Sequence, residues 1–188
     1  MYSVLKKWGI NISDSDWYPE YLLKNYPDKS FYIDKFPLSV ENAHKFNQVD
    51  VFFQKVKGKA LRDKFLLMEK KYINVLTKLW LYNQVFVGAT IHMDEDFKKI
   101  DKKYVKGYQK LQLRLKQSGL AEITDKKELD YLIQLGTRDI AEIAFYCKEY
   151  ELIIIPSWSC FIIYFNNLSK FKIVKDIVES EGMFLRMQ

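Results

Sequence analysis

One five-residue stretch gathers most of the side chains that could act on a substrate directly. It is His92-Met93-Asp94-Glu95-Asp96, which places an imidazole beside three carboxylates. Such a group can hold a divalent cation or abstract a proton. The same acids also suit the first turn of a helix, because carboxylates there complement the positive end of the helix dipole. The stretch is therefore typical either of a metal-assisted hydrolase or of an ordinary helix start.

The other candidates for catalysis lack the neighbours that such chemistry needs. His44 lies beside the apolar stripe of an expected helix, and Ser157 lacks the flanking glycines of a nucleophile elbow. Cys160 could act as a nucleophile only if the fold brought His92 to it. Neither Cys147 nor Cys160 has a metal-ligand spacing. We therefore expect a non-enzymatic protein without catalytic residues, metal or cofactor, and keep the metal-assisted hydrolase centred on His92 as an alternative.

Aromatic side chains offer a different function, because Trp and Tyr dominate the binding energy of protein interfaces. Trp158 stands between two apolar runs, where it either covers the core or contacts a partner. Trp17 and Tyr18 belong to an aromatic segment, residues 1–37, that either packs on the core or forms a binding face. The predicted partner-binding residues are Trp158, Asp94, Glu95 and Asp96, with Trp17 and Tyr18 as a second patch.

The charge of the chain is typical of a protein with an acidic partner, and also of a chain rich in Lys, Ile, Asn, Tyr and Phe that an AT-rich gene encodes. The net charge is +6 and the isoelectric point about 9.1. Most of this charge comes from lysine, whereas arginine is the residue suited to planar recognition of phosphates and bases. A helix expected over 97–117 carries lysines around most of its polar circumference, which is typical of a solvated face or of a surface that contacts phosphates. Nucleic acid is therefore a second candidate partner.

Length and composition predict one globular domain spanning residues 1–188. The chain has 188 residues, of which 48% are apolar, and it contains no Gly/Ser-rich or Pro-rich linker. Its first residues lack a basic region followed by an apolar run, and its longest apolar stretch is too short to cross a bilayer. We expect a cytoplasmic protein that does not associate with membranes.

The elements that must position the candidate residues centre on 151–165. Two short apolar runs, 151–155 and 160–165, are rich in β-branched and aromatic residues and are separated by Pro156-Ser157-Trp158-Ser159. This pattern predicts two neighbouring antiparallel strands. Neither run alternates with polar residues, which predicts that both faces of these strands are covered.

The remaining patterns complete an α+β fold. A strand is expected at 183–187 and another at 140–146, where the spacing also fits a helix. The fold predicted is one domain with a small, mainly antiparallel sheet near the C-terminus, formed by these four strands and packed against several amphipathic helices. Shorter patterns predict a helix at 17–25, a strand at 31–36 and a strand at 85–91. Apolar spacing predicts helices at 39–57, with Ser39 as the N-cap, and at 60–82, 95–117, 126–135 and 170–181.

The C-terminal quarter carries a likeness to a known class of proteins. It runs from Tyr150-Glu151-Leu152-Ile153-Ile154-Ile155-Pro156-Ser157-Trp158 to Gly182-Met183-Phe184-Leu185. In size and general character the chain resembles the cognate immunity proteins of bacterial polymorphic toxin systems, including contact-dependent growth inhibition. The resemblance implies a small α+β protein that binds a cognate toxin and blocks its active site. Immunity proteins against nucleases are commonly acidic, so a basic chain implies a toxin with an acidic binding face or one that is not a nuclease.

Overall fold

The computed structural model describes residues 1–12, 18–53, 56–90, 102–157 and 160–187. Within these residues, strands β1 to β7 form one antiparallel sheet. The strands are β1 (Ser30–Asp34), β2 (Val85–Thr90), β3 (Ala121–Glu122), β4 (Glu142–Cys147), β5 (Leu152–Ser157), β6 (Cys160–Phe165) and β7 (Phe184–Arg186). Their order in the sheet is β3-β2-β4-β5-β6-β1-β7.

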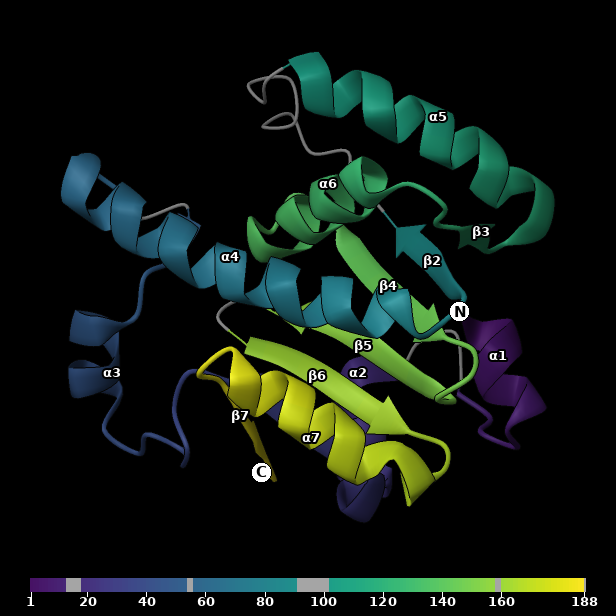
Figure 1. Ribbon diagram of the computed structural model, residues 1–188, viewed down its shortest axis with the longest axis horizontal. Coiled ribbons are helices and arrows are strands. Elements are labelled where there is room, and N and C mark those ends of the chain that lie inside the picture. The colour runs from purple at the N-terminus through teal and green to yellow at the C-terminus, as the bar shows by residue number, and fades with distance from the viewer. Residues whose placement is uncertain (13–17, 54–55, 91–101, 158–159, 188) are drawn as a thin grey trace.

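Helices cover both faces of this sheet, which confirms the α+β class (Figure 1). The described α-helices are α1 (Tyr2–Lys7), α2 (Tyr18–Asn25), α3 (Ala43–Val49), α4 (Lys59–Leu81), α5 (Lys102–Ser118), α6 (Lys126–Thr137) and α7 (Phe171–Ser180). The core on one face is built with residues of α4, α6 and α7, and a second core on the other face with residues of α1 and α2. None of the helices in the described residues combines the length and the apolar character that a bilayer crossing needs.

The centre of the sheet is the meander of β4, β5 and β6. Adjacent residues of β5 point to opposite faces, so Ile154 enters the core under α4 and α6 while Ile153 enters the core under α1 and α2. Leu152 to Pro156 are all buried. The predicted antiparallel pair with two covered faces is confirmed, and the ambiguous segment 140–146 is a strand, β4.

The sheet is larger than the small one predicted near the C-terminus, because strands from the N-terminal half of the chain extend it on both sides. β1 lies between β6 and β7, with Ile33 opposite Phe161 on one side and Leu185 on the other. On the far side β2 pairs with β4, and β3 forms the edge. The strands predicted at 31–36 and 85–91 therefore exist, but they belong to the same sheet as the C-terminal strands.

The predicted helix over 39–57 was also wrong in extent, because α3 covers only Ala43–Val49. Its N-cap is Asn42, whose side-chain carbonyl oxygen accepts a hydrogen bond from the backbone three residues on. Ser39 does not cap it; its hydroxyl accepts instead from Arg186 Nη1 at 3.0 Å. The helix ends at Asp50, whose backbone is extended and whose side chain is buried.

The other long helices lie close to their predicted bounds. α4, α6 and α7 match the predictions at 60–82, 126–135 and 170–181 within two residues at each end. α5 extends to Ser118, while the start predicted at residue 95 lies outside the described residues. Asp125 caps α6 by accepting a hydrogen bond from the Lys127 backbone N–H at 2.9 Å.

Helix α6 approaches β5 so closely that only glycine fits at position 136. A Cβ atom at Gly136 would lie 2.7 Å from both Cβ and Cγ of Pro156. We therefore expect Gly136→Ala to lower the free energy of unfolding by about 1–3 kcal/mol, although the same change in an open helix stabilises by about 1 kcal/mol. Urea unfolding measures the sign. A more stable variant would contradict this close contact, and Pro156→Ala, which removes Cγ, is expected to relieve part of the loss.

Candidate functional site

Most of the predicted contact residues lie outside the described residues, and so does His92. The exception is Tyr18, which begins α2 and is half-buried beside the core under α1 and α2. Its ring stands edge-on to Tyr2 with centroids 5.6 Å apart, and burial raises the pKa of the Tyr18 hydroxyl. Tyr18 thus contributes to packing between α1 and α2. The predicted residues outside the described ranges are Trp17, Asp94, Glu95, Asp96 and Trp158.

The two cysteines are poor nucleophiles. Cys147 is fully buried, and burial raises the pKa of its thiol. Burial also raises the pKa of Cys160 to about 12, with the nearby Asp34 carboxylate adding to the effect. Both thiols are therefore neutral at physiological pH, whereas a cysteine nucleophile reacts as the thiolate.

The remaining candidates for metal or proton chemistry are His44 and the described acids. His44 is exposed on α3, and its Nε2 lies 2.8 Å from Gln48 Nε2. In the part of the chain that the structure describes, no three His, Cys, Asp or Glu side chains are grouped so that they could hold a metal ion.

The lysine-rich helix α5 lies on the outside of the fold, and α6 lies between α5 and α4 (Figure 1). Leu111 is buried, and the Arg114 guanidinium binds the Glu128 carboxylate and the Glu122 carbonyl oxygen. Lys110 and Lys116 are exposed to solvent. The guanidinium on this helix thus anchors α5 to the fold, while the exposed charges among its described side chains are Lys110 and Lys116.

The most distinctive surface feature is the N-terminal half of α4, residues 59–70, which we call the α4 overhang. Helix α4 has 23 residues and so is about 34 Å long. Strands of six residues, such as β5 and β6, span only about 20 Å. In Figure 1 the overhang extends past the end of the sheet and stands above α3.

The apolar seam of α4 continues into this overhang, where Phe65 is still buried and only its first residue, Leu61, is exposed. The seam consists of Leu61, Phe65, Met68, Tyr72, Val75 and Leu79, at steps of four and three residues. Val75 and Leu79, over the sheet, are fully buried, whereas Leu61 is 42% exposed. Two further apolar side chains beside it are exposed to a similar degree, Val49 by 44% and Phe53 by 39%. A seam that is buried along the sheet therefore ends in solvent.

We call these three exposed side chains, Val49, Phe53 and Leu61, the overhang patch. The Phe53 ring packs against Phe65 with centroids 5.4 Å apart. Lys64 Nζ donates a hydrogen bond to the Val49 carbonyl oxygen at 2.9 Å. Because Phe65 and Lys64 both lie one helical turn after Leu61, these two contacts place Phe53 and the Val49 backbone near the start of α4.

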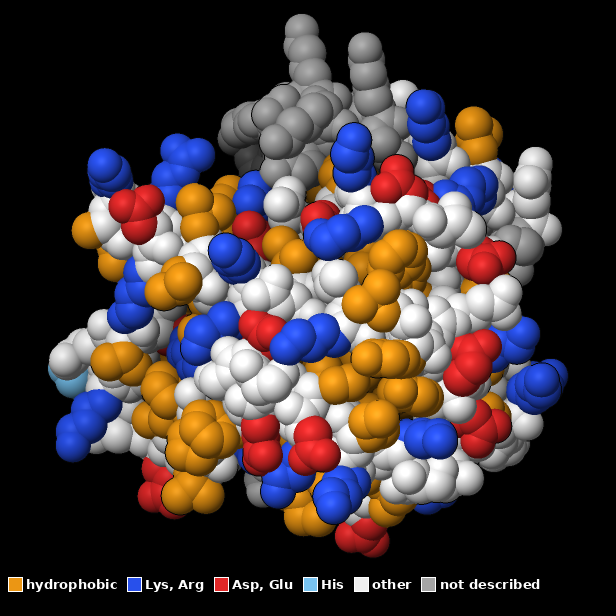
Figure 2. Space-filling model, viewed as in Figure 1, with side chains coloured by type: hydrophobic (Ala, Val, Ile, Leu, Met, Phe, Trp, Pro, Cys, Tyr) orange, Lys and Arg blue, Asp and Glu red, His pale blue; other side chains and the backbone are white. Residues whose placement is uncertain are grey.

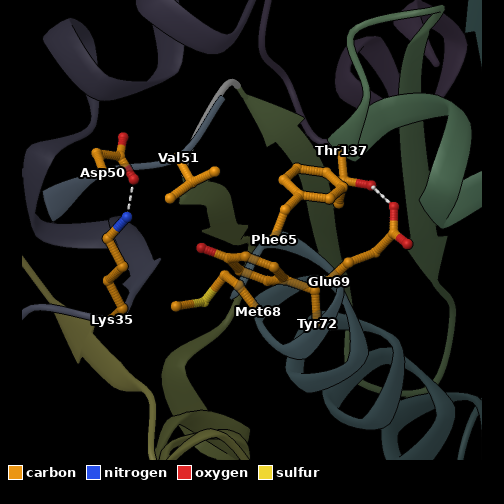
Figure 3. Close-up of a pocket in the computed structure, with 8 residues that line it drawn as sticks. All are labelled: Lys35, Asp50, Val51, Phe65, Met68, Glu69, Tyr72 and Thr137. Carbon is orange, nitrogen blue, oxygen red and sulfur yellow. Dashed lines mark hydrogen bonds and ion pairs between the residues drawn. The ribbon is translucent and has the colours of Figure 1, made fainter. Parts of the chain in front are cut away.

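Beneath the overhang lies a small pocket (Figure 3). The space in it that the centre of a water molecule can reach is about 20 Å³, which is room for about one water. The pocket is therefore too small for an organic ligand. Its lining residues are Lys35, Asp50, Val51, Phe65, Met68, Glu69, Tyr72 and Thr137.

One wall of the pocket is a buried ion pair between Lys35 and Asp50. The Asp50 side chain is 1% exposed and that of Lys35 is 14% exposed. The Lys35 ammonium also lies 5.1 Å from the centre of the Phe36 ring, and burial lowers the pKa of Lys35. This pair joins the end of β1 to the segment that follows α3. It therefore holds that segment, which lies next to the overhang, against the sheet.

The opposite wall is a second buried ion pair, between Glu69 of α4 and Arg138 after α6. Arg138 Nε and Nη2 donate to the two Glu69 carboxylate oxygens, each at 2.8 Å, and Thr137 Oγ1 donates to Oε1 at 2.9 Å. The guanidinium carbon also stands 5.1 Å from the centre of the Phe53 ring. This pair fixes α4 to α6 and supports the overhang patch from behind.

The exposed charge around the patch is positive. The acids Asp50 and Glu69 are buried and paired, so they contribute little to the outer surface. Figure 2 shows blue basic side chains among orange apolar ones over α3 and the start of α4. Asp63 is an exposed acid here. The exposed basic residues between 43 and 70 are Lys45, Lys57, Lys59, Arg62, Lys64 and Lys70.

Sequence reasoning assigned the patch residues to the interior. Val49 and Phe53 belonged to the predicted helix 39–57, and Leu61 to the seam of the helix 60–82. Periodicity identifies the apolar face of a helix. It does not show how much of that face is covered by the rest of the fold. The density of basic residues at 57–71 was the one feature that set this segment apart.

Comparisons with known proteins give no relative for this chain. No protein-family model matches it. No curated protein and no solved structure matches it either.

Proposed function

We propose that this is a non-catalytic, cytoplasmic protein-binding protein, an immunity protein that neutralises a cognate bacterial toxin by binding it and blocking its active site. The observation that supports this function is the overhang patch. Val49, Phe53 and Leu61 expose 39–44% of their surface at the end of an otherwise buried seam. Contiguous exposed apolar side chains with a polar rim are typical of sites where proteins bind one another.

The shape and support of the overhang suit occlusion of an active site. A helix that projects beyond the sheet can enter a concave surface, which is the usual form of an active site. The Glu69–Arg138 and Lys35–Asp50 pairs hold the overhang in place before binding. Because little order is then lost on association, more of the contact energy remains as affinity.

The sequence-predicted residue Trp158 belongs to the same proposal. Its neighbour Ser157 pairs with Cys160, and Cys160 begins the strand in which Phe161 faces Ile33, one residue before Asp34. The described residues on both sides of Trp158 thus lie at the end of the sheet where Lys35 follows β1. Trp158→Ala is therefore tested together with the patch. The other residues predicted to contact the partner are Trp17, Tyr18, Asp94, Glu95 and Asp96.

The test is growth rescue by co-expression with the toxin encoded beside this gene. We expect the wild-type protein to restore growth and to bind the toxin, and Leu61→Glu to weaken binding by about 2 kcal/mol or more, roughly thirtyfold. The matched control is Leu168→Glu, because Leu168 is 43% exposed but precedes α7, away from the overhang. Isothermal titration calorimetry measures both affinities, and circular dichroism confirms that both variants fold.

Two results would refute parts of this proposal. If Leu61→Glu binds and protects as the wild type does while Trp158→Ala does not, the contact surface is the sequence-predicted one and the overhang patch is dismissed. If the purified protein binds no toxin but is retained on polynucleotide in a salt-dependent way, the alternative of a nucleic-acid-associated protein using α5 replaces the immunity function.

A further inference from the structure

We infer that the overhang patch recognises an acidic amphipathic face of its partner, in which apolar side chains are flanked by Asp or Glu. This inference rests on the proposed function and adds the chemistry of the partner. It follows from the distribution of charge around Val49, Phe53 and Leu61.

The first step is that two acids at this end of the fold are buried. Asp50 is paired with Lys35 and Glu69 with Arg138, and the two carboxylates are 1% and 3% exposed. Among the described residues of 43–70, Asp63 is the one exposed acid, beside six exposed basic residues. This surface therefore carries a positive potential. A partner face must complement this potential to approach closely.

The second step is that the positive groups stand beside the apolar side chains. Lys64 lies one turn from Leu61, and its hydrogen bond to the Val49 carbonyl oxygen holds its ammonium next to the patch. Lys57, Lys59 and Arg62, close to Leu61 in the sequence, are exposed as well. Basic and apolar groups therefore lie together at the start of α4.

The third step favours a protein partner over nucleic acid. Phosphate contacts need only the basic groups, and bases stack on flat aromatic rings. Val49 and Leu61 are aliphatic, so a polynucleotide would leave them exposed. Carboxylates on an apolar protein face satisfy the lysines and bury the aliphatic side chains together.

The experiment uses two synthetic helical peptides with the same leucine seam, one flanked by glutamate and the other by lysine. Fluorescence anisotropy measures their binding to the full-length protein. We expect the glutamate peptide to bind, and to bind about tenfold more weakly when NaCl is raised from roughly 50 to roughly 300 mM. Leu61→Glu and Lys64→Glu are each expected to weaken it by about tenfold or more. Lys172→Glu, at an exposed lysine of α7, is the control and is expected to leave binding unchanged.

Three outcomes would overturn the inference: equal or tighter binding of the lysine peptide, glutamate-peptide binding that Leu61→Glu leaves unchanged, and displacement of the glutamate peptide by duplex DNA bound at the patch. None of these depends on toxin neutralisation. If growth rescue requires Leu61 and the lysine peptide binds better, the immunity function stands and the acidic partner is refuted. If the glutamate peptide binds as expected and no toxin is neutralised, the acidic partner face stands and the immunity function is refuted.

Discussion

Replacing Glu69 by alanine is expected to lower the free energy of unfolding by about 3–5 kcal/mol. The carboxylate is 3% exposed and accepts two hydrogen bonds from Arg138 and one from Thr137. Without it, the guanidinium remains 13% exposed beside the Phe53 ring with its bidentate acceptor removed. The carboxylate that offsets most directly the desolvation of this charge is then lost. Chemical denaturation of the purified variant measures the loss.

The control for this substitution is Glu179→Ala. Glu179 forms an ion pair with Lys175 at 3.7 Å on the surface of α7, where both side chains are more than 40% exposed. Exposed pairs at this spacing contribute about 0.3–0.5 kcal/mol, so Glu179→Ala is expected to be nearly neutral. Equal losses for the two variants would show that burial of Glu69 does not determine its contribution.

Replacing Phe161 by alanine is expected to destabilise the fold by about 3–5 kcal/mol. The Phe161 ring is 2% exposed and stacks on Tyr72 of α4, with centroids 4.1 Å apart and planes inclined by 11°. Tyr72 also donates a hydrogen bond to the Ile33 carbonyl oxygen at 3.4 Å. The substitution leaves a cavity at the point where α4 crosses β6 and β1, immediately after the overhang in the sequence. Thermal and urea unfolding report the loss.

The matched control is Phe184→Ala in β7. Phe184 is 37% exposed, so its replacement removes less buried area and leaves no closed cavity. We expect a loss of no more than about 1 kcal/mol. If Phe161→Ala is as stable as Phe184→Ala, the stacked pair does not anchor α4 to the sheet.

The centre of the fold could be predicted from sequence because the pattern that specifies it lies within one short stretch of the chain. The runs 151–155 and 160–165 are apolar without alternation and separated by a short breaker, which specifies a hairpin buried on two faces. The end of α3 was missed because Val49 and Phe53 keep helical spacing although the chain becomes extended at Asp50. The buried pair of Asp50 with Lys35 decides this conformation, and tertiary contacts of that kind leave no periodic pattern in the sequence.

The candidate site was harder to predict than the fold. The sequence favoured aromatic and acidic residues for partner binding, on the statistics of interfaces. The overhang patch consists mostly of aliphatic residues that any pattern assigns to a core. Its exposure depends on the length of α4 relative to the strands beneath it. The bounds of α4 were predicted well, but its placement over the strands was not.

The position of β1 between β6 and β7 determines the order in which the sheet can be assembled. Lys29, just before β1, hydrogen-bonds the carbonyl oxygen of Asn166, 137 positions later in the chain. Closing so long a loop is entropically costly, so hairpins such as β5–β6 are expected to form first and β1 last. Until β1 arrives, β6 has an open edge in a very apolar sheet, and such edges promote aggregation. A nascent chain of this protein therefore has to keep its first strand unpaired until almost all of it has been synthesised.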